Sequence, residues 1–240
     1  MTAAPKMLLL QARKPDDVML AHEHECFADT LGVDQDRLIP HNLCSGPPPI
    51  EQAMRYDAVL VGGSGEYSVS KNNLPEQDGY LELLGELVAR NKAMFASCFG
   101  FHGMVQALGG EVIRDAEHME VGSFELTLTE HGARDELFGK LPARFWAQEG
   151  HSDRAARMPE GLPCLASSAL APFQGLRVPG ASIWATQFHP ELDFDSSFSR
   201  FEYFLTHQGK PEEAEAMRAR LRQSPEASSL LRAFHELVFG

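Results

Sequence analysis

The feature that most constrains the fold of this chain is an apolar segment that ends at a cysteine and opens at once into a helical pattern. Residues 92–97 are mostly apolar or small, and Cys98 follows them. The next apolar positions recur at helical spacing, at Phe101, Met104, Val105 and Leu108. This order predicts a strand, a tight turn and a helix, which is the arrangement of a nucleophile elbow. Open α/β sheets bind substrates at the carboxyl ends of their strands, and the turn would present Cys98 there.

The predicted position of Cys98 favours a reactive thiol. The N-terminus of a helix stabilises negative charge, so we expect the pKa of Cys98 to be lowered toward the thiolate. Gly100 would let the helix lie close to the strand, and the pair at 109–110 would end the helix. The alternative is a structural cysteine, because free cysteines commonly pack as small buried hydrophobes.

A second stretch supplies the groups that a cysteine nucleophile needs. Residues 182–188 form a β-type run that ends at His189, and Glu191 follows two residues later. A thiol requires a base that accepts its proton and a third group that orients this base. Cys98, His189 and Glu191 are therefore the predicted nucleophile, base and orienting carboxylate.

These two stretches resemble the motifs of the class I, triad-type glutamine amidotransferases, which are G-x-C-x-G-x-Q and F-H-P-E. The second motif is complete at residues 188–191. In the first motif Cys98 and Gly100 match, Ala96 replaces the leading glycine, and His102 stands where the family has glutamine. The resemblance covers about residues 5–205 of the chain.

The resemblance implies both a fold and a reaction. The expected fold is α/β, with a mainly parallel twisted sheet flanked by helices, flavodoxin-like, and extra antiparallel strands. We expect residues 1–205 to form the amidotransferase-like domain and residues 206–240 to form a C-terminal helical extension. In the implied reaction Cys98 attacks the side-chain amide of glutamine or a related γ-glutamyl compound, and water cleaves the resulting thioester. No metal site and no organic cofactor are implied.

The resemblance also implies binding roles for residues outside the triad. Residues 61–64 resemble the S-G-G-P segment of the family, so the N–H groups of Gly63 and Phe99 would form an oxyanion hole. Gly62 would then lie beside the substrate.

Two histidines are further candidates for substrate binding. Residues 150–153 resemble an S-H-x-D loop of the family, which points to His151, although an ordinary solvent loop fits the same residues. His102 is shorter than glutamine, and when neutral it offers one donor and one acceptor at fixed positions. A pocket built around His102 should therefore fit free glutamine less well, unless this residue only packs locally.

The net charge and the cysteine content of the chain limit the classes of partner and of metal or disulfide site that we expect. The 240 residues include 21 basic and 34 acidic side chains, a formal net charge of −13, which argues against nucleic acid and against an anionic membrane surface. A small-molecule amide is the expected substrate. The four cysteines, at positions 26, 44, 98 and 164, form no C-x-x-C pair, so neither a zinc site nor a disulfide framework is indicated. This usage fits a reducing cytoplasm.

The other segments alternate between strands and helices up to the cysteine helix and are mostly strands beyond it. We expect strands at 7–10, 57–61, 111–113, 122–128, 144–147 and 163–166, a glycine-rich turn at 62–65, and helices at 20–31, 80–90, 196–205, 211–222 and from 225 onward. Two of these helices have an apolar face, formed by Phe198, Phe201, Phe204 and Leu205 in the helix at 196–205, and by Leu230, Leu231, Phe234, Leu237 and Val238 in the last helix. The first helix contains His-Glu-His-Glu-Cys at 22–26. A third ligand at metal-site spacing is missing, so we interpret this run as a solvated helix face with ordinary packing.

Three functions remain open at this point. The chain could be an amidotransferase subunit that passes ammonia to a separate synthetase, because no fused acceptor domain is expected. It could instead be a free-standing hydrolase of another γ-glutamyl amide or ester. A catalytically silent binding or regulatory module is the third option, and the complete set of Cys98, His189 and Glu191 counts against it.

Overall fold

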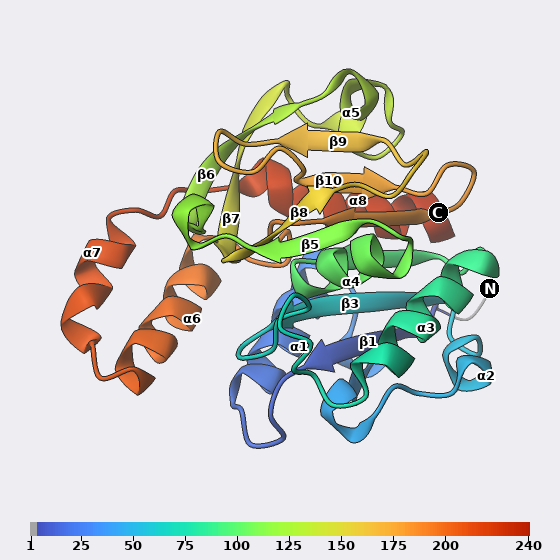
Figure 1. The fold of residues 1–240 in the computed structure, drawn as a ribbon, viewed down its shortest axis with the longest axis horizontal. Helices are drawn as coiled ribbons and strands as arrows, with labels where there is room; N and C mark the ends of the chain where they lie inside the picture. Colours follow the sequence, from blue (N-terminus) through green and yellow to red (C-terminus); the bar gives the residue numbers. More distant parts are fainter. Residues whose placement is uncertain (1–3) are drawn as a thin grey trace.

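The computed structural model describes residues 4–240 and is built around one large mixed sheet. The strands of this sheet are β1 (Met7–Ala12), β2 (Leu38–Asn42), β3 (Ala58–Ser64), β4 (Met94–Ser97), β6 (Glu120–Leu128), β7 (Arg144–His151), β9 (Cys164–Ser167), β10 (Gly175–Arg177) and β11 (Ile183–Thr186). Their order is β2-β1-β3-β4-β11-β10-β9-β6-β7 (Figure 1). A separate two-stranded sheet consists of β5 (Glu111–Arg114) and β8 (Asp153–Arg157).

The direction of pairing divides the large sheet into two parts. From β2 to β11 the neighbouring strands are parallel, and from β11 through β10, β9 and β6 to β7 they are antiparallel. This confirms the predicted α/β fold with a parallel sheet and added antiparallel strands. Because β4 and β11 are parallel neighbours, with Ser97 opposite Thr186, their carboxyl ends lie side by side.

The helices of residues 4–240 lie on both faces of the sheet and beyond its end. They are α1 (Met19–Leu31), α2 (Ile50–Ala53), α3 (Gln77–Ala89), α4 (Phe99–Ala107), α5 (Glu130–Arg134), α6 (Phe194–His207), α7 (Ala214–Arg218) and α8 (Pro225–Phe239). Successive side chains of a strand point to opposite faces. Leu8 and Leu10 of β1 therefore pack with α3 and α4, whereas Met7 and Leu9 pack with α1 and α8. Figure 1 shows α3 and α4 on the near side of the sheet.

The last helix, α8, belongs to the core on the α1 side. Leu230, Leu231 and Phe234 are buried there, as the apolar stripe predicts. Leu237 was expected in the same stripe but is 38% exposed, whereas the next residue, Val238, is partly buried and packs against this core. The division of the chain into a domain ending at 205 and an extension stays a prediction, since α8 packs as a core element.

The segment between Glu191 and α8 differs from the prediction. The helix expected at 211–222 is reduced to the five residues of α7 after a short 3-10 turn. In α6 the buried residues are Ser197 and Arg200, while Phe198 and Phe201 are only partly buried, so the expected apolar core face is wrong. Figure 1 shows α6 and α7 as an arm at the end of the sheet, and Phe201 and Phe204 line a cavity between this arm and β7 instead of packing in the core.

Two segments that the sequence indicated as turns or loops belong to strands. The glycines at 62–63 continue β3, which reaches Ser64 because Ser64 pairs with Ala12 of β1. His151 ends β7 opposite Glu120 of β6, and β8 begins two residues later. Sheet pairing overrides local turn propensity at both places. Among residues 4–240, no helix combines the length and apolar character needed to cross a membrane.

Candidate active site

Cys98 occupies a strained turn between β4 and α4. Its backbone angles, φ 50° and ψ −99°, lie in a region that residues other than glycine rarely adopt. Its N–H donates to the carbonyl oxygen of Thr186 at 2.8 Å, and its own carbonyl accepts from the N–H of His102 at 3.0 Å. The predicted strand, turn and helix are therefore present, and strand β11 holds the turn in place.

The helix after Cys98 lies against the sheet because residue 100 has no side chain. A Cβ atom on Gly100 would lie 2.9 Å from the Cβ atoms of both Ala96 and Val61. This distance is shorter than real Cβ contacts, so only glycine permits the approach. The expected role of Gly100 is confirmed.

His189 and Glu191 follow β11, next to the turn at Cys98. The Nδ1 atom of His189 lies 2.7 Å from Oε1 of Glu191. The backbone N–H of His189 donates to the carbonyl of Gln148 on β7 at 2.9 Å, which fixes the histidine between two strands. A carboxylate that accepts from Nδ1 leaves Nε2 with its lone pair, the form in which a histidine accepts a proton.

Arg200 adds a positive charge to this pair. Its Nη1 atom lies 3.6 Å from Oε1 of Glu191, and the side chain of Arg200 is 6% exposed. Burial opposes ionisation of Glu191, but the charge and hydrogen bond of His189, together with the charge of Arg200, outweigh it and lower the pKa of Glu191 to about 2. Glu191 is therefore a carboxylate throughout the neutral range. Sequence reasoning missed Arg200 because it lies on a helix expected to bury phenylalanines.

The thiol of Cys98 does not have the lowered pKa predicted from its place at a helix N-terminus. Burial, with the negative charges of Glu149 and Glu191, raises the pKa of Cys98. Its side chain is 7% exposed, and removal from water disfavours the thiolate more than the helix terminus favours it. The resting side chain is therefore a thiol.

We expect alkylation of Cys98 in the free protein to become faster continuously from pH 7 to about 9.5, because only the thiolate reacts and its fraction keeps increasing below the raised pKa. Timed iodoacetamide labelling followed by mass spectrometry of the Cys98 peptide measures this rate. The peptides of Cys44 and Cys164 in the same digest report general labelling. A Cys98 rate that reaches a plateau below about pH 8 would contradict the raised pKa.

Two adjoining cavities reach Cys98 and His189. The cavity at Cys98 has a volume of about 180 Å³, and its lining includes Ser64, Tyr67, Cys98, Phe99, His102 and His151. The cavity at His189 has a volume of about 430 Å³ and is also lined by Arg200 and Glu149. Ser64 lines both cavities, so they adjoin at the end of β3.

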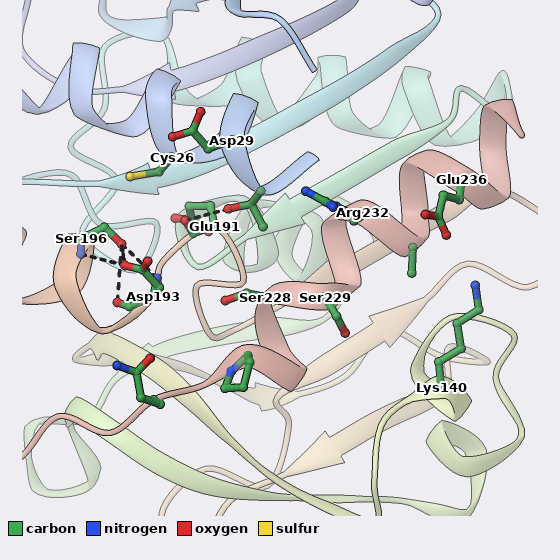
Figure 2. Close-up of a pocket in the computed structure, with 14 residues that line it drawn as sticks. Cys26, Asp29, Lys140, Glu191, Asp193, Ser196, Ser228, Ser229, Arg232 and Glu236 are labelled. Carbon is green, nitrogen blue, oxygen red and sulfur yellow. Dashed lines mark hydrogen bonds between the residues drawn. The ribbon is translucent and has the colours of Figure 1, made fainter. Parts of the chain in front are cut away.

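A larger pocket of about 790 Å³ lies on the far side of Glu191 (Figure 2). Figure 2 shows it between α1, which carries Cys26 and Asp29, and α8, which carries Ser228 and Arg232. Neither Cys98 nor His189 lines this pocket. The candidate active site is therefore the smaller cavity at Cys98, because the larger pocket contains neither Cys98 nor His189.

His102 lies in α4 and lines the Cys98 cavity. Its Nε2 atom is 2.7 Å from Oε1 of Gln187, and an amide oxygen can only accept, so Nε2 carries the hydrogen. Burial and the nearby charge of His151 lower the pKa of His102 to about 4. His102 is therefore neutral near pH 7.

The N–H of Gly63 already has a partner. It donates to Oε1 of Glu23 at 3.1 Å, and this carboxylate also accepts from Nε2 of Gln11 at 3.1 Å and Nη2 of Arg13 at 3.3 Å. A Cβ atom on Gly63 would lie 2.7 Å from Cε1 of His189. The strand thus passes between a buried carboxylate and the ring of His189, and glycine is required there.

The run at 22–26 is only partly the solvated helix face that the sequence indicated, because Glu25 is exposed but two other residues of the run are buried. Glu23 is fully buried and Cys26 is 9% exposed. Gly62 lies against the same carboxylate, since a Cβ atom on it would be 2.8 Å from Oε1 of Glu23. The polar composition of the run did not indicate that Glu23 is buried, where it forms an ion pair with Arg13 from the segment after β1.

His151 is part of the cavity wall, but both of its nitrogens face protein groups. Its Nδ1 atom lies 2.9 Å from the carbonyl oxygen of Asp153, and its Nε2 atom lies 3.0 Å from Oε2 of Glu120. His151 therefore presents its ring to the cavity and directs its polar atoms into the protein.

Comparison with known proteins shows a matching protein family and several relatives that are similar in sequence. The chain matches the family model described as Glutamine amidotransferase class-I over residues 42–198. It is 30% identical over 156 residues to GMP synthase (glutamine-hydrolyzing) of Thermosipho melanesiensis, covering 65% of this chain and 28% of that protein. It is 29% identical over 164 residues to a glutamine-hydrolyzing GMP synthase subunit of Saccharolobus solfataricus, covering 68% of this chain and 78% of that protein. The chain therefore spans little more than a quarter of the length of the Thermosipho protein.

Solved structures share the fold. A glutamine amidotransferase from Thermotoga maritima superposes with a TM-score of 0.72 at 16% identity, covering 98% of this chain and 99% of that one. A glutamine amidotransferase from Methylobacillus flagellatus gives 0.71 at 18% identity, covering 98% and 92%. At 16% and 18% identity, these solved structures show only that the fold is shared. The family model, in contrast, matches more than half of this chain, and the matched residues include Cys98, His189 and Glu191. The chain belongs to the class-I glutamine amidotransferase family.

Proposed function

We propose that this chain hydrolyses the side-chain amide of glutamine through a thioester on Cys98 and supplies the ammonia to a separate synthetase subunit. The observation that carries the proposal is the 2.7 Å contact of His189 with Glu191 at the end of β11, beside the strained turn of Cys98 at the end of β4. The Saccharolobus relative, a glutamine-hydrolyzing subunit of GMP synthase, supports a partner on another chain. The net charge of −13 argues against nucleic acid or an anionic membrane as partner.

In the proposed reaction the proton of Cys98 moves to Nε2 of His189 while the sulfur forms a bond to the amide carbon. The C–N bond then breaks, and His189 returns the proton to the leaving ammonia. Water attacks the γ-glutamyl thioester with His189 again as base, which releases glutamate and restores the thiol. Glu191 orients the ring and stabilises its protonated form. Burial raises the pKa of Cys98, so the resting sulfur keeps its proton, which supports transfer of this proton to His189 during the attack.

Two backbone N–H groups are the proposed oxyanion donors. Phe99 is the first residue of α4, where an N–H has no acceptor within the helix. Gly63 would be the second donor, and for this its N–H has to leave Glu23. Removal of one oxyanion donor typically costs about 10²–10³ in kcat, so we expect slow hydrolysis while Gly63 stays bound to Glu23.

Glutamate release from glutamine tests the proposed activity. We expect the purified wild-type chain to release glutamate slowly but measurably faster than Cys98→Ser, which keeps the shape of the residue and removes the thiol. The same assay with γ-glutamyl methylamide measures whether the rate of glutamate release changes when methylamine replaces ammonia as the leaving group. Equal rates for wild type and Cys98→Ser on both compounds would refute the proposal and favour a silent binding module.

A free-standing hydrolase of a different γ-glutamyl amide is the second candidate, and His102 favours it. The family motif has a glutamine at this position, whose amide both donates and accepts. Neutral His102 directs its Nε2 hydrogen to Gln187 and offers no amide to a substrate. Substrate selection at this cavity would then differ from that of a glutamine-specific enzyme.

We expect His102→Gln to increase the rate of glutamine hydrolysis by about 2–10-fold, because the new amide can form one hydrogen bond with the substrate and such a bond contributes about 0.5–1.5 kcal/mol. Glutamate release by both proteins under identical conditions measures it. Gln106→His, an exposed position on the same helix, is the matched control and should leave the rate unchanged. Brisk hydrolysis by the wild type, with no gain in His102→Gln, would refute a specificity role for His102.

A further inference from the structure

Three buried ionisable side chains meet beside the Cys98 cavity and have no part in the proposed reaction. Antiparallel pairing of β6 with β7 places Glu120 opposite His151. Glu149 lies two residues before His151 on β7, and residues two apart in a strand point to the same face. All three side chains are at most 4% exposed. This cluster therefore places two carboxylates and one imidazole together in the protein interior.

The spacing within the cluster is that of a metal coordination shell. The Nε2 atom of His151 lies 3.0 Å from Oε2 of Glu120 and 3.3 Å from Oε2 of Glu149. One candidate ligand atom from each residue lies within 4.8 Å of the other two. Zn²⁺ binds nitrogen and oxygen at about 2.0–2.2 Å, and a tetrahedron of that size separates its ligand atoms by about 3.3–3.6 Å. Small side-chain movements would bring the three atoms to this geometry.

The second nitrogen of His151 is held as in many metal sites. Its Nδ1 atom is 2.9 Å from the backbone carbonyl of Asp153, which can only accept, so Nδ1 carries a hydrogen. Metal-bound histidines commonly donate their other N–H to such a carbonyl. Gln174 donates through Nε2 to Oε2 of Glu120 at 2.6 Å, which orients that carboxylate as well. The cluster thus has outer groups that orient two of its three members.

The carboxylates have unused oxygens. Both oxygens of Glu149 and Oε1 of Glu120 are buried and have no hydrogen-bond partner within residues 4–240. The ring of His151 lies 3.3 Å from Oε2 of Glu149, but one imidazolium can balance only one of the two buried carboxylates. A second buried negative charge is costly, and a proton on Glu149 would remove that charge but leave its O–H without an acceptor. A divalent cation would accept lone pairs from both carboxylates. With a neutral histidine, the net charge of such a site is zero.

We infer that Glu120, Glu149 and His151 form a binding site for a divalent transition-metal cation, and Zn²⁺ best matches their one nitrogen and two carboxylate ligands. The site adjoins the Cys98 cavity, whose wall includes His151. It is distinct from Cys98, His189 and Glu191, and its metal binding does not depend on the hydrolysis proposed above. A bound cation would link β6 to β7 and counter the negative charge of Glu149 near Cys98.

Zn²⁺ titration by calorimetry, after removal of metals with a chelator, tests this site. We expect one equivalent of Zn²⁺ to bind the wild type and to raise its Tm relative to its own metal-free form. Glu149→Gln keeps the shape of the side chain but removes a ligand, and it should weaken binding by at least about 10–100-fold. Glu125→Gln on β6, whose side chain is 48% exposed, is the matched control and should bind as the wild type does.

A Cys98→Ser variant separates this site from the triad, because a thiolate and His189 could also bind Zn²⁺. We expect Cys98→Ser to keep the affinity and the Tm increase of the wild type. Loss of binding in Cys98→Ser, unchanged binding in Glu149→Gln, or absence of binding in the wild type would each overturn the inference.

Discussion

Replacing Cys98 or His189 with alanine is expected to lower glutamate release from glutamine by about 10⁴-fold or more, down to the rate without the triad. The two losses should be nearly equal, because a nucleophile without its base, or a base without its nucleophile, performs no step of the reaction. Glu191→Gln should cost less, since it leaves both reacting groups in place and removes the charge that orients and stabilises His189. Steady-state glutamate release by the three variants measures these effects.

His207→Ala is the control for this series, because His207 lies on the exposed face of α6 and contacts the carbonyl of Tyr203. It should keep the wild-type rate. Substantial activity in His189→Ala, with circular dichroism equal to that of the wild type, would mean that another base serves Cys98. His102 and His151 are unsuited to that role as they stand, because each directs Nε2 at a protein oxygen.

Replacing Glu23 with alanine is expected to reduce the free energy of unfolding by about 3–5 kcal/mol. Glu23 is fully buried and faces the guanidinium of Arg13, which is 1% exposed. The variant would leave this positive charge buried with only Asp17 at 3.3 Å, and it would remove the acceptor of the Gly63 N–H. Urea denaturation followed by circular dichroism measures the change in unfolding free energy.

Glu25→Ala is the matched control, since Glu25 is an exposed glutamate on the same helix. It should change the unfolding free energy by less than about 0.5 kcal/mol. Glu23→Gln should fall between the two alanine variants, because it keeps hydrogen-bonding oxygen at the site and loses the charge. Equal midpoints and slopes for Glu23→Ala and Glu25→Ala would show that the Arg13 pair contributes little to stability.

Much of the candidate site could be predicted from local pattern. The apolar run before Cys98 and the helical spacing after it predicted β4, the turn and α4, because a buried parallel strand and a packed helix each leave their own periodicity. The β-type run before His189 predicted β11 in the same way. Parallel pairing of these two strands then brings Cys98 and His189 to one edge of the sheet. The apolar periodicity of each segment and the general rules for α/β sheets were sufficient to predict the positions of Cys98 and His189.

Other features depended on contacts that no single segment encodes. The lowered pKa expected for Cys98 is reversed by burial among side chains from β7 and the loop after β11. The helical stripe of α6 did not predict that Arg200 is buried beside Glu191. In each case the sign of the effect depends on desolvation and on charges from distant segments.

The sequence by itself determined the α/β fold, the turn at Cys98 and the order of the triad motifs, because apolar periodicity reports which face of an element is buried. Only the tertiary structure decided where charges are buried. Glu23 looks like a solvated residue until Arg13 is placed against it, and Glu120, Glu149 and His151 become a cluster only through the register of β6 with β7. A buried charge is stable only with its partner, and that partner comes from a remote part of the chain.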